Sequence, residues 1–133
     1  MDNTMVNLRG TLRGVAGVLT TVAGSLAVAS ALHLSGQVSG RGEPYDAEHA
    51  GIAEAIIGAV LVAGVVVMFR SPQRARTAGL VAAGFATAGF LLGLTMTAQG
   101  GHWPDIVYHL AVLPFLIGSL VVLVRSRAVL VRT

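Results

Sequence analysis

The stretch GIAEAIIGAVLVAGVVVMF, residues 51–69, decides how the rest of the chain is interpreted. It is almost entirely apolar, and its one ionisable side chain is Glu54. A helix needs about 20 apolar residues to cross about 30 Å of hydrocarbon at 1.5 Å per residue. We therefore expect a transmembrane helix that carries a carboxyl group below the headgroup level.

Three further apolar runs of similar length occupy residues 12–34, 78–98 and 106–124. The chain is 54% hydrophobic and 11% charged, a balance typical of a membrane protein rather than a soluble domain. The connections between the runs are short, so consecutive helices should be antiparallel neighbours. The sequence predicts an all-α fold, a four-transmembrane-helix antiparallel bundle in up-down-up-down order, with residues 1–133 forming a single domain.

The arginines indicate the orientation of this bundle. Eight of the nine flank the same end of the predicted spans, and only Arg41 lies at the other end. Because cytoplasmic loops are enriched in arginine, both termini are predicted to be cytoplasmic, in a protein integral to the plasma membrane. Lysine is absent and no basic stripe occurs, so we expect no nucleic-acid partner.

Small residues recur at helical spacing within the spans. Gly10 and Gly14, Gly89 and Gly93, and the ladder Ala55, Ala59 and Ala63 allow helices to approach closely. Such stripes are compatible with packing inside the bundle or with a homo-oligomer interface, and the sequence leaves both open.

The histidines and most acidic residues gather at the end away from the arginines, which is predicted to face the extracytoplasmic side. Trp103 and Tyr45 are expected at the membrane interface there. The titratable residues at this end are His33, Glu43, Asp46, Glu48, His49, Glu54, His102, Asp105 and His109. An apolar chain has no folding reason to collect these groups, so this end is the candidate working end.

Glu54, His109 and Asp105 are the candidate catalytic residues. An unpaired carboxylate at the depth of Glu54 is costly, so it should be protonated or bound to a cation or hydrogen-bond donor. Asp105 and His109 are four residues apart and share a helix face, so Asp105 is expected to orient the imidazole. We expect Glu54 and His109 to meet across the bundle. Candidate partners of Glu54 are His109, His33, Tyr108, Thr95 and Thr97.

Further residues are candidates for contact with a bound molecule: His33, His49, Tyr108, Thr95, His102 and Trp103. Cysteine is absent and the histidines lack the helical spacing of a known metal motif, so no metal site is predicted. The sequence names no cofactor.

Residues 51–64, with Glu54 between Gly51 and Gly58 and then Leu61 and Gly64, resemble the second-helix signature of DoxX-like membrane proteins. Four spans in a chain of this length, and the basic turn Arg70–Arg76, are also similar to that family. The resemblance implies a four-helix membrane bundle and a redox-linked role, since some members are small subunits of quinone-reducing complexes.

Three functions are compatible with the sequence. The first is a membrane enzyme or redox subunit whose outer pocket binds a small apolar molecule, quinol-like or a polycyclic metabolite, and performs acid/base or redox-linked chemistry on it. The second is an accessory structural subunit of a larger membrane complex. The third is a proton-coupled small transporter, in which Glu54 alternates between substrate and proton.

Overall fold

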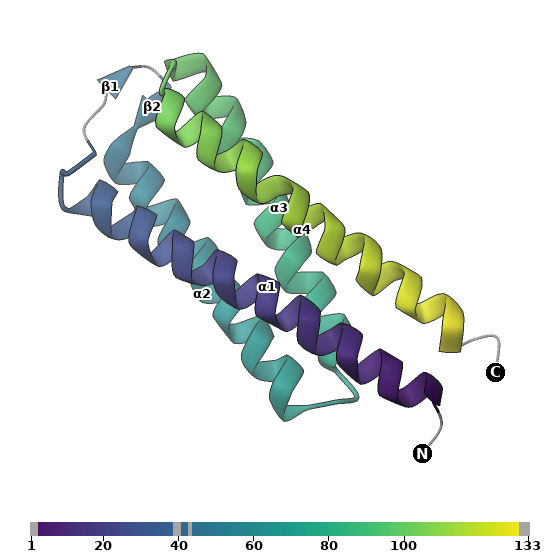
Figure 1. The fold of residues 1–133 in the computed structure, drawn as a ribbon. Helices are drawn as coiled ribbons and strands as arrows, with labels where there is room; N and C mark the ends of the chain where they lie inside the picture. The colour runs from purple at the N-terminus through teal and green to yellow at the C-terminus, as the bar shows by residue number, and fades with distance from the viewer. Residues whose placement is uncertain (1–2, 39–40, 43, 131–133) are drawn as a thin grey trace.

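The computed structural model describes residues 3–38, 41–42 and 44–130, and these form a bundle of four long helices (Figure 1). The helices are α1 (Asn3–Leu34), α2 (Ala47–Arg70), α3 (Ala75–Gly100) and α4 (Trp103–Leu130). All four are long and apolar enough to cross a membrane, which confirms the all-α transmembrane bundle that the sequence predicts. Glu43 and Arg132 lie outside the described residues.

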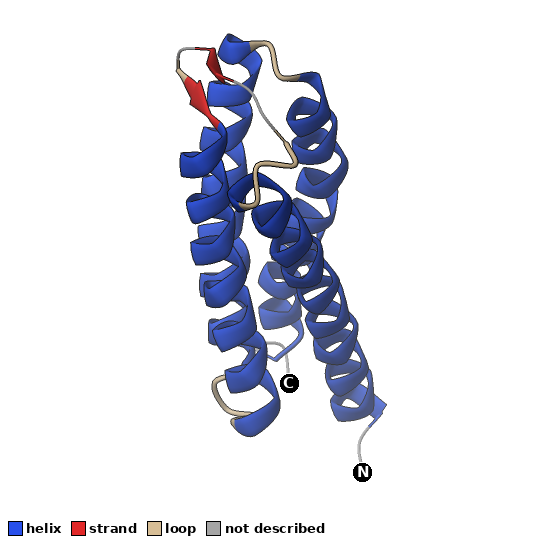
Figure 2. Ribbon diagram, turned by 90° about the vertical axis from the view of Figure 1, so that its left-hand side faces the viewer, coloured by secondary structure: helices blue, strands red, loops and turns tan. Residues whose placement is uncertain are grey.

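The helices run up and down in sequence order, so both described ends of the chain lie at one end of the bundle (Figure 2). At the opposite end, α1 and α2 are joined by a short antiparallel pair of strands that the sequence does not predict. Strand β1 (Arg41–Gly42) pairs with β2 (Tyr45–Asp46), in the register Arg41 opposite Asp46. This hairpin places Tyr45 over the end of the bundle.

Local backbone chemistry sets where the helices end. Gly36 follows α1 with φ 73°, and Gly101 follows α3 with φ 70°, a left-handed conformation in which glycine carries no Cβ penalty. The Gly101 N–H donates to the Thr97 carbonyl and closes α3. At the start of α2, the Asp46 carboxylate accepts a hydrogen bond of 3.1 Å from the His49 backbone N–H.

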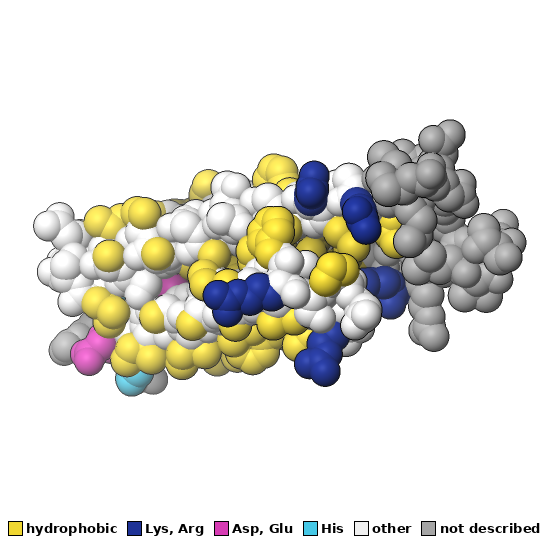
Figure 3. All heavy atoms as spheres, turned by 90° about the horizontal axis from the view of Figure 1, so that it is seen from below, with side chains coloured by type: hydrophobic (Ala, Val, Ile, Leu, Met, Phe, Trp, Pro, Cys, Tyr) yellow, Lys and Arg dark blue, Asp and Glu magenta, His cyan; other side chains and the backbone are white. Residues whose placement is uncertain are grey.

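The centre of the bundle is mostly aliphatic, with α2 packed against α1 and α3, and α3 packed against α4. The largest fully buried side chains are Leu19, Leu26, Leu61, Phe90, Leu116 and Leu123. The outward faces also carry large apolar side chains, as helices in contact with lipid do. In Figure 3 the arginines lie towards one end of the apolar surface, and an acidic residue and a histidine lie at the other.

The glycines divide into an inner and an outer set. Gly51, Gly64, Gly79, Gly89 and Gly93 stand where an added Cβ would press on a neighbouring helix. Gly10 and Gly14 have nothing within 4 Å of such an atom, and the Ala55, Ala59 and Ala63 ladder is exposed. Close packing inside the bundle therefore uses the Gly89 and Gly93 stripe. It does not use the Gly10 and Gly14 pair or the alanine ladder of α2.

Candidate functional site

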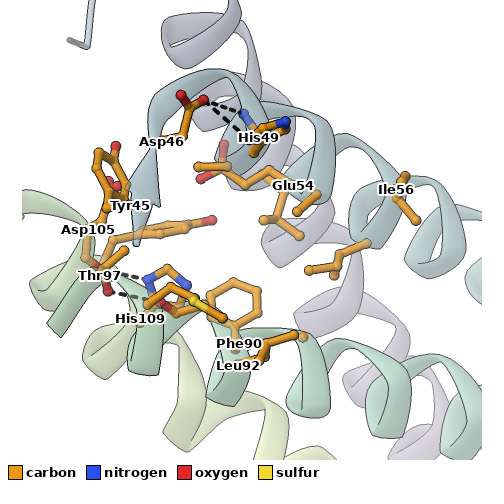
Figure 4. A pocket seen from close by; sticks show the side chains of 18 of the residues that line it. Tyr45, Asp46, His49, Glu54, Ile56, Phe90, Leu92, Thr97, Asp105 and His109 are labelled. Carbon is orange, nitrogen blue, oxygen red and sulfur yellow. Dashed lines mark hydrogen bonds and ion pairs between the residues drawn. The ribbon is translucent and has the colours of Figure 1, made fainter. Parts of the chain in front are cut away.

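A cavity of about 460 Å³ lies at the hairpin end of the bundle, bordered by α2, α3 and the first turns of α4 (Figure 4). Most of its wall is apolar, and several of these side chains reach the outer surface of the bundle. The apolar part includes Leu26, Ala53, Ile56, Ile57, Phe85, Phe90, Leu92 and Met96. The polar part consists of Tyr45, Asp46, His49, Glu54, Thr97, Asp105, Tyr108 and His109.

Helix α2 places the Glu54 carboxyl on its buried face. Gly51, Glu54, Gly58 and Leu61 follow one another at helical spacing, and all four are buried. Glu54 is the eighth residue of α2, so it lies roughly 10 Å along the axis from the first residue at 1.5 Å per residue. Glu54 is 7% exposed, so its carboxyl group needs a hydrogen-bond partner within the protein.

Helix α1 comes very close to α2 one turn before Glu54. The Ser30 hydroxyl donates a hydrogen bond of 2.7 Å to the Gly51 carbonyl. A Cβ at Gly51 would lie 2.9 Å from Leu34 Cγ and 3.0 Å from His33 Cβ, inside normal contact distance. The absence of a side chain at Gly51 therefore allows the end of α1 to lie against α2 and brings His33 to Glu54.

Glu54 pairs with His33. Its Oε2 atom lies 2.8 Å from His33 Nδ1, and the imidazole side chain is 3% exposed. The other ring nitrogen of His33, Nε2, lies 3.2 Å from the Tyr45 hydroxyl and 3.3 Å from Asp105 Oδ2. A single buried imidazole thus has an acidic group at each of its two nitrogens.

The expected contact between Glu54 and His109 is absent among the described residues. Both residues border the same cavity, but among the described residues no hydrogen bond or ion pair joins them. His109 Nδ1 lies 2.6 Å from the Asp105 backbone carbonyl, which can only accept, so Nδ1 is the donor. Asp105 therefore orients His109 through its main chain rather than through its carboxylate.

The fixed Nδ1–H bond determines what His109 offers to the cavity. In the neutral ring, the remaining nitrogen, Nε2, is a hydrogen-bond acceptor. The ring packs against Phe90 with centroids 5.0 Å apart, and Gly93 on α3 leaves the space that Nε2 occupies. A side chain at Gly93 would collide with the imidazole, so this glycine is part of the site.

The Asp105 carboxylate points to the end of the bundle, where it meets a second histidine. Asp105 Oδ2 lies 3.1 Å from His102 Nδ1, but neither atom has an aligned hydrogen-bond partner among the described residues. The His102 ring stacks on Tyr45, with centroids 4.6 Å apart and planes within 10°. Asp105 therefore lies between two imidazoles.

Tyr45 is buried within the end of the bundle, so its ring does not face outward as that of an amphipathic interface residue would. It is 5% exposed, because the hairpin folds the ring inward over His33 and His102. Burial raises the pKa of the Tyr45 hydroxyl well above its ordinary value, and the neighbouring Asp105 raises it further. Tyr45 thus stays a neutral hydroxyl at physiological pH.

The other predicted contact residues divide by position. Tyr108 borders the cavity and its hydroxyl lies 2.8 Å from Ser25 on α1, while His49 lies exposed at the rim. Thr95 and Trp103 are exposed and do not border the cavity. His33 and His102 stand behind the polar wall and contact it through Glu54 and Asp105.

Tyr45, Phe90 and Gly93 belong to the site, although the sequence does not mark them as site residues. Phe90 packs against both Tyr108 and His109 and so fixes the two polar side chains of α4. The glycine at 93 lies four residues after Gly89, a spacing that the sequence shows but that indicates helix packing as readily as room for a ligand. Within the described part of the chain, no three His, Asp or Glu side chains are arranged to hold a metal ion.

Compared with protein-family models, curated proteins and solved structures, the chain matches none of them. The likeness of residues 51–64 to the DoxX-like signature therefore stays a prediction from the sequence.

Proposed function

We propose that this protein is a small integral membrane protein that binds a hydroxyl-bearing apolar molecule, quinol-like or polycyclic, and exchanges protons with it at Glu54. The observation that carries the proposal is the cavity, which joins a large apolar wall to a compact polar end. Drug-sized ligands bind in cavities of about 300–1,000 Å³ with this division of surface. At about 460 Å³ the cavity falls within that range.

The polar end favours a ligand that donates hydrogen bonds. The carboxyl of Glu54 accepts when ionised, and Nε2 of a neutral His109 also accepts. The hydroxyl of Tyr108 is already engaged with Ser25. A hydroxylated ring, such as a quinol, matches these acceptors better than its oxidised carbonyl form does.

The apolar wall favours entry from the bilayer. Ile56, Phe85, Leu92 and Met96 border the cavity and are also exposed on the outside of the bundle, where lipid would surround them. A membrane-dissolved molecule would therefore reach Glu54 without crossing water. Any electrons that the molecule loses would pass to an acceptor in a partner complex, and this chain's contribution is the proton exchange.

We further propose that both termini are cytoplasmic and that the cavity faces the extracytoplasmic side. Arg70, Arg74, Arg76 and Arg125 lie at the same end of the bundle as the two described chain ends. The positive-inside rule favours the cytoplasm for that end. The DoxX-like resemblance agrees with a quinone-linked role. Assembly as a homo-oligomer or within a larger complex stays a prediction.

Binding of radiolabelled decylubiquinol to the protein in nanodiscs tests the proposal, with empty nanodiscs as the blank. Loss of a hydrogen bond to a charged group costs about 1.5–3 kcal/mol, so Glu54→Gln should weaken binding by roughly 10- to 150-fold. His109→Ala should also weaken it. Glu48→Gln, which removes an exposed carboxylate of the same helix outside the cavity, should leave it unchanged. Unaltered binding in both cavity variants rejects the proposal.

A further inference from the structure

Four side chains form a series of close contacts from the cavity to the end of the bundle. The first contact is a hydrogen bond, and the two contacts of Asp105 are ion-pair distances without hydrogen-bond alignment. Glu54 Oε2 lies 2.8 Å from His33 Nδ1, and His33 Nε2 lies 3.3 Å from Asp105 Oδ2. Asp105 Oδ2 lies 3.1 Å from His102 Nδ1. Each step joins a carboxyl to an imidazole, the two side-chain types that most readily exchange protons near neutral pH.

Burial along this series changes from one end to the other. The side chains of His33, Glu54 and Asp105 are at most 10% exposed, whereas that of His102 is 17% exposed, in the turn between α3 and α4. Glu54, at one end of this series, borders the cavity, and His102, at the other end, is the most exposed of the four.

We propose that Glu54, His33, Asp105 and His102 form a proton path between the cavity and the aqueous surface. This path deepens the proposed function and rests on it, because a proton at Glu54 is useful only if a bound molecule exchanges it there. If these residues only stabilised the fold, the partly exposed imidazole of His102 would not be needed at the outer end.

Each transfer along the path conserves atoms and charge. The Glu54 O–H bond breaks as His33 Nδ1–H forms, and the His33 Nε2–H bond breaks as Asp105 Oδ2–H forms. Asp105 then passes its proton to His102 Nδ1, and His102 releases one to water from its other nitrogen. No electron moves. Each transfer leaves an imidazole in its other tautomer, and a turn of the ring about its Cβ–Cγ bond restores the first arrangement of donor and acceptor before the next proton passes.

Tyr45 has a positioning role in this path. Its hydroxyl lies 3.2 Å from His33 Nε2 and its ring stacks on His102, so it favours the ring orientations in which both imidazoles lie beside Asp105. Because burial raises the pKa of this hydroxyl, Tyr45 remains protonated and does not compete as a base.

The test is exchange of the His33 ring N–H with water, measured by saturation transfer in the ¹⁵N-histidine-labelled protein in bicelles. The His33 ring carries at least one N–H proton in every protonation state, so the signal is always defined. His102→Gln and Asp105→Asn break the path without touching the contact between Glu54 and His33, and each should slow exchange by at least about tenfold, equivalent to about 1.4 kcal/mol in barrier. Glu48→Gln removes an exposed titratable group of α2 that lies outside the cavity and the path, and this variant should exchange like the wild type.

A His33 signal that is too fast to observe in the wild type but appears in the two path variants also supports the proposal. Equal exchange in the wild type and both path variants overturns it. Equal slowing in Glu48→Gln also overturns it, because the slowing would then not depend on the path residues. Loss of helical circular dichroism identifies a variant that fails to fold, and the other path variant then decides. Decylubiquinol binding is a separate readout, so normal binding with unaltered exchange rejects the path and leaves the proposed function standing.

Discussion

Replacing Gly51 with alanine tests the close contact between α1 and α2 that brings His33 to Glu54. An added Cβ would lie 2.9 Å from Leu34 Cγ and 3.0 Å from His33 Cβ. His33 Cβ is fixed by the α1 backbone and cannot move away without a shift of that backbone, whereas Leu34 Cγ can move by rotation about χ1. Overpacking of this kind costs about 1–3 kcal/mol.

Gly58 provides the matched control, since it lies two turns further along the same buried face of α2. Its added Cβ would meet Leu26 Cβ at 3.6 Å and the Ala23 carbonyl at 3.8 Å, which is ordinary contact. Glycine to alanine within a helix gains about 0.5–1 kcal/mol in both variants. Gly58→Ala should therefore be stabilised by about that amount, and Gly51→Ala should be less stable than Gly58→Ala by about 1–3 kcal/mol.

The assay is unfolding of the purified protein in bicelles by increasing fractions of sodium dodecyl sulfate, followed by helical circular dichroism. A single cooperative transition gives a free energy of unfolding for each variant. If Gly51→Ala is as stable as Gly58→Ala, the helices do not touch at this point and the contact between His33 and Glu54 loses its structural basis.

Two further predictions concern the cavity and the hairpin. Ala53→Phe places a ring in the cavity wall and should weaken decylubiquinol binding by at least about tenfold, or 1.4 kcal/mol. Ala55→Phe places the ring on an exposed position outside the cavity and should bind like the wild type. Equal affinities of the two variants would contradict the assigned cavity. Burial raises the pKa of Tyr45, so above about pH 10 the unfolded chain loses this proton while the folded protein keeps it, and stability should fall by about 1.4 kcal/mol per pH unit. Tyr45→Phe should lack this part of the alkaline slope in the same unfolding assay, and an identical slope would show that Tyr45 is not buried.

The sequence predicts the membrane bundle well because the signal is long and redundant. Four apolar runs of spanning length, joined by short connections, leave few arrangements other than antiparallel helices. The helices extend beyond the predicted spans, because polar residues near the ends, such as Glu48 and Gln99, continue the helical hydrogen bonding without needing lipid.

The partners within the site were harder to predict, because they depend on the relative depths of the helix ends. Glu54 and His109 are both about two turns from the hairpin end of their helices, so a contact between them is the natural expectation. His33, however, is the penultimate residue of α1, and α1 ends deeper than α2 begins. This offset follows from the close approach at Gly51 and from the β1–β2 hairpin, neither of which hydropathy reveals.

Photolabelling with an azido-quinone in bicelles, followed by mapping of the modified peptides, tests whether a quinol-like molecule binds beside Glu54. We expect labels on the cavity-facing residues of α2 and α3, between 50 and 57 and between 89 and 97, and competition by decylubiquinol. Labels spread evenly over the lipid-facing surfaces of all four helices, with no competition, would contradict a binding cavity beside Glu54.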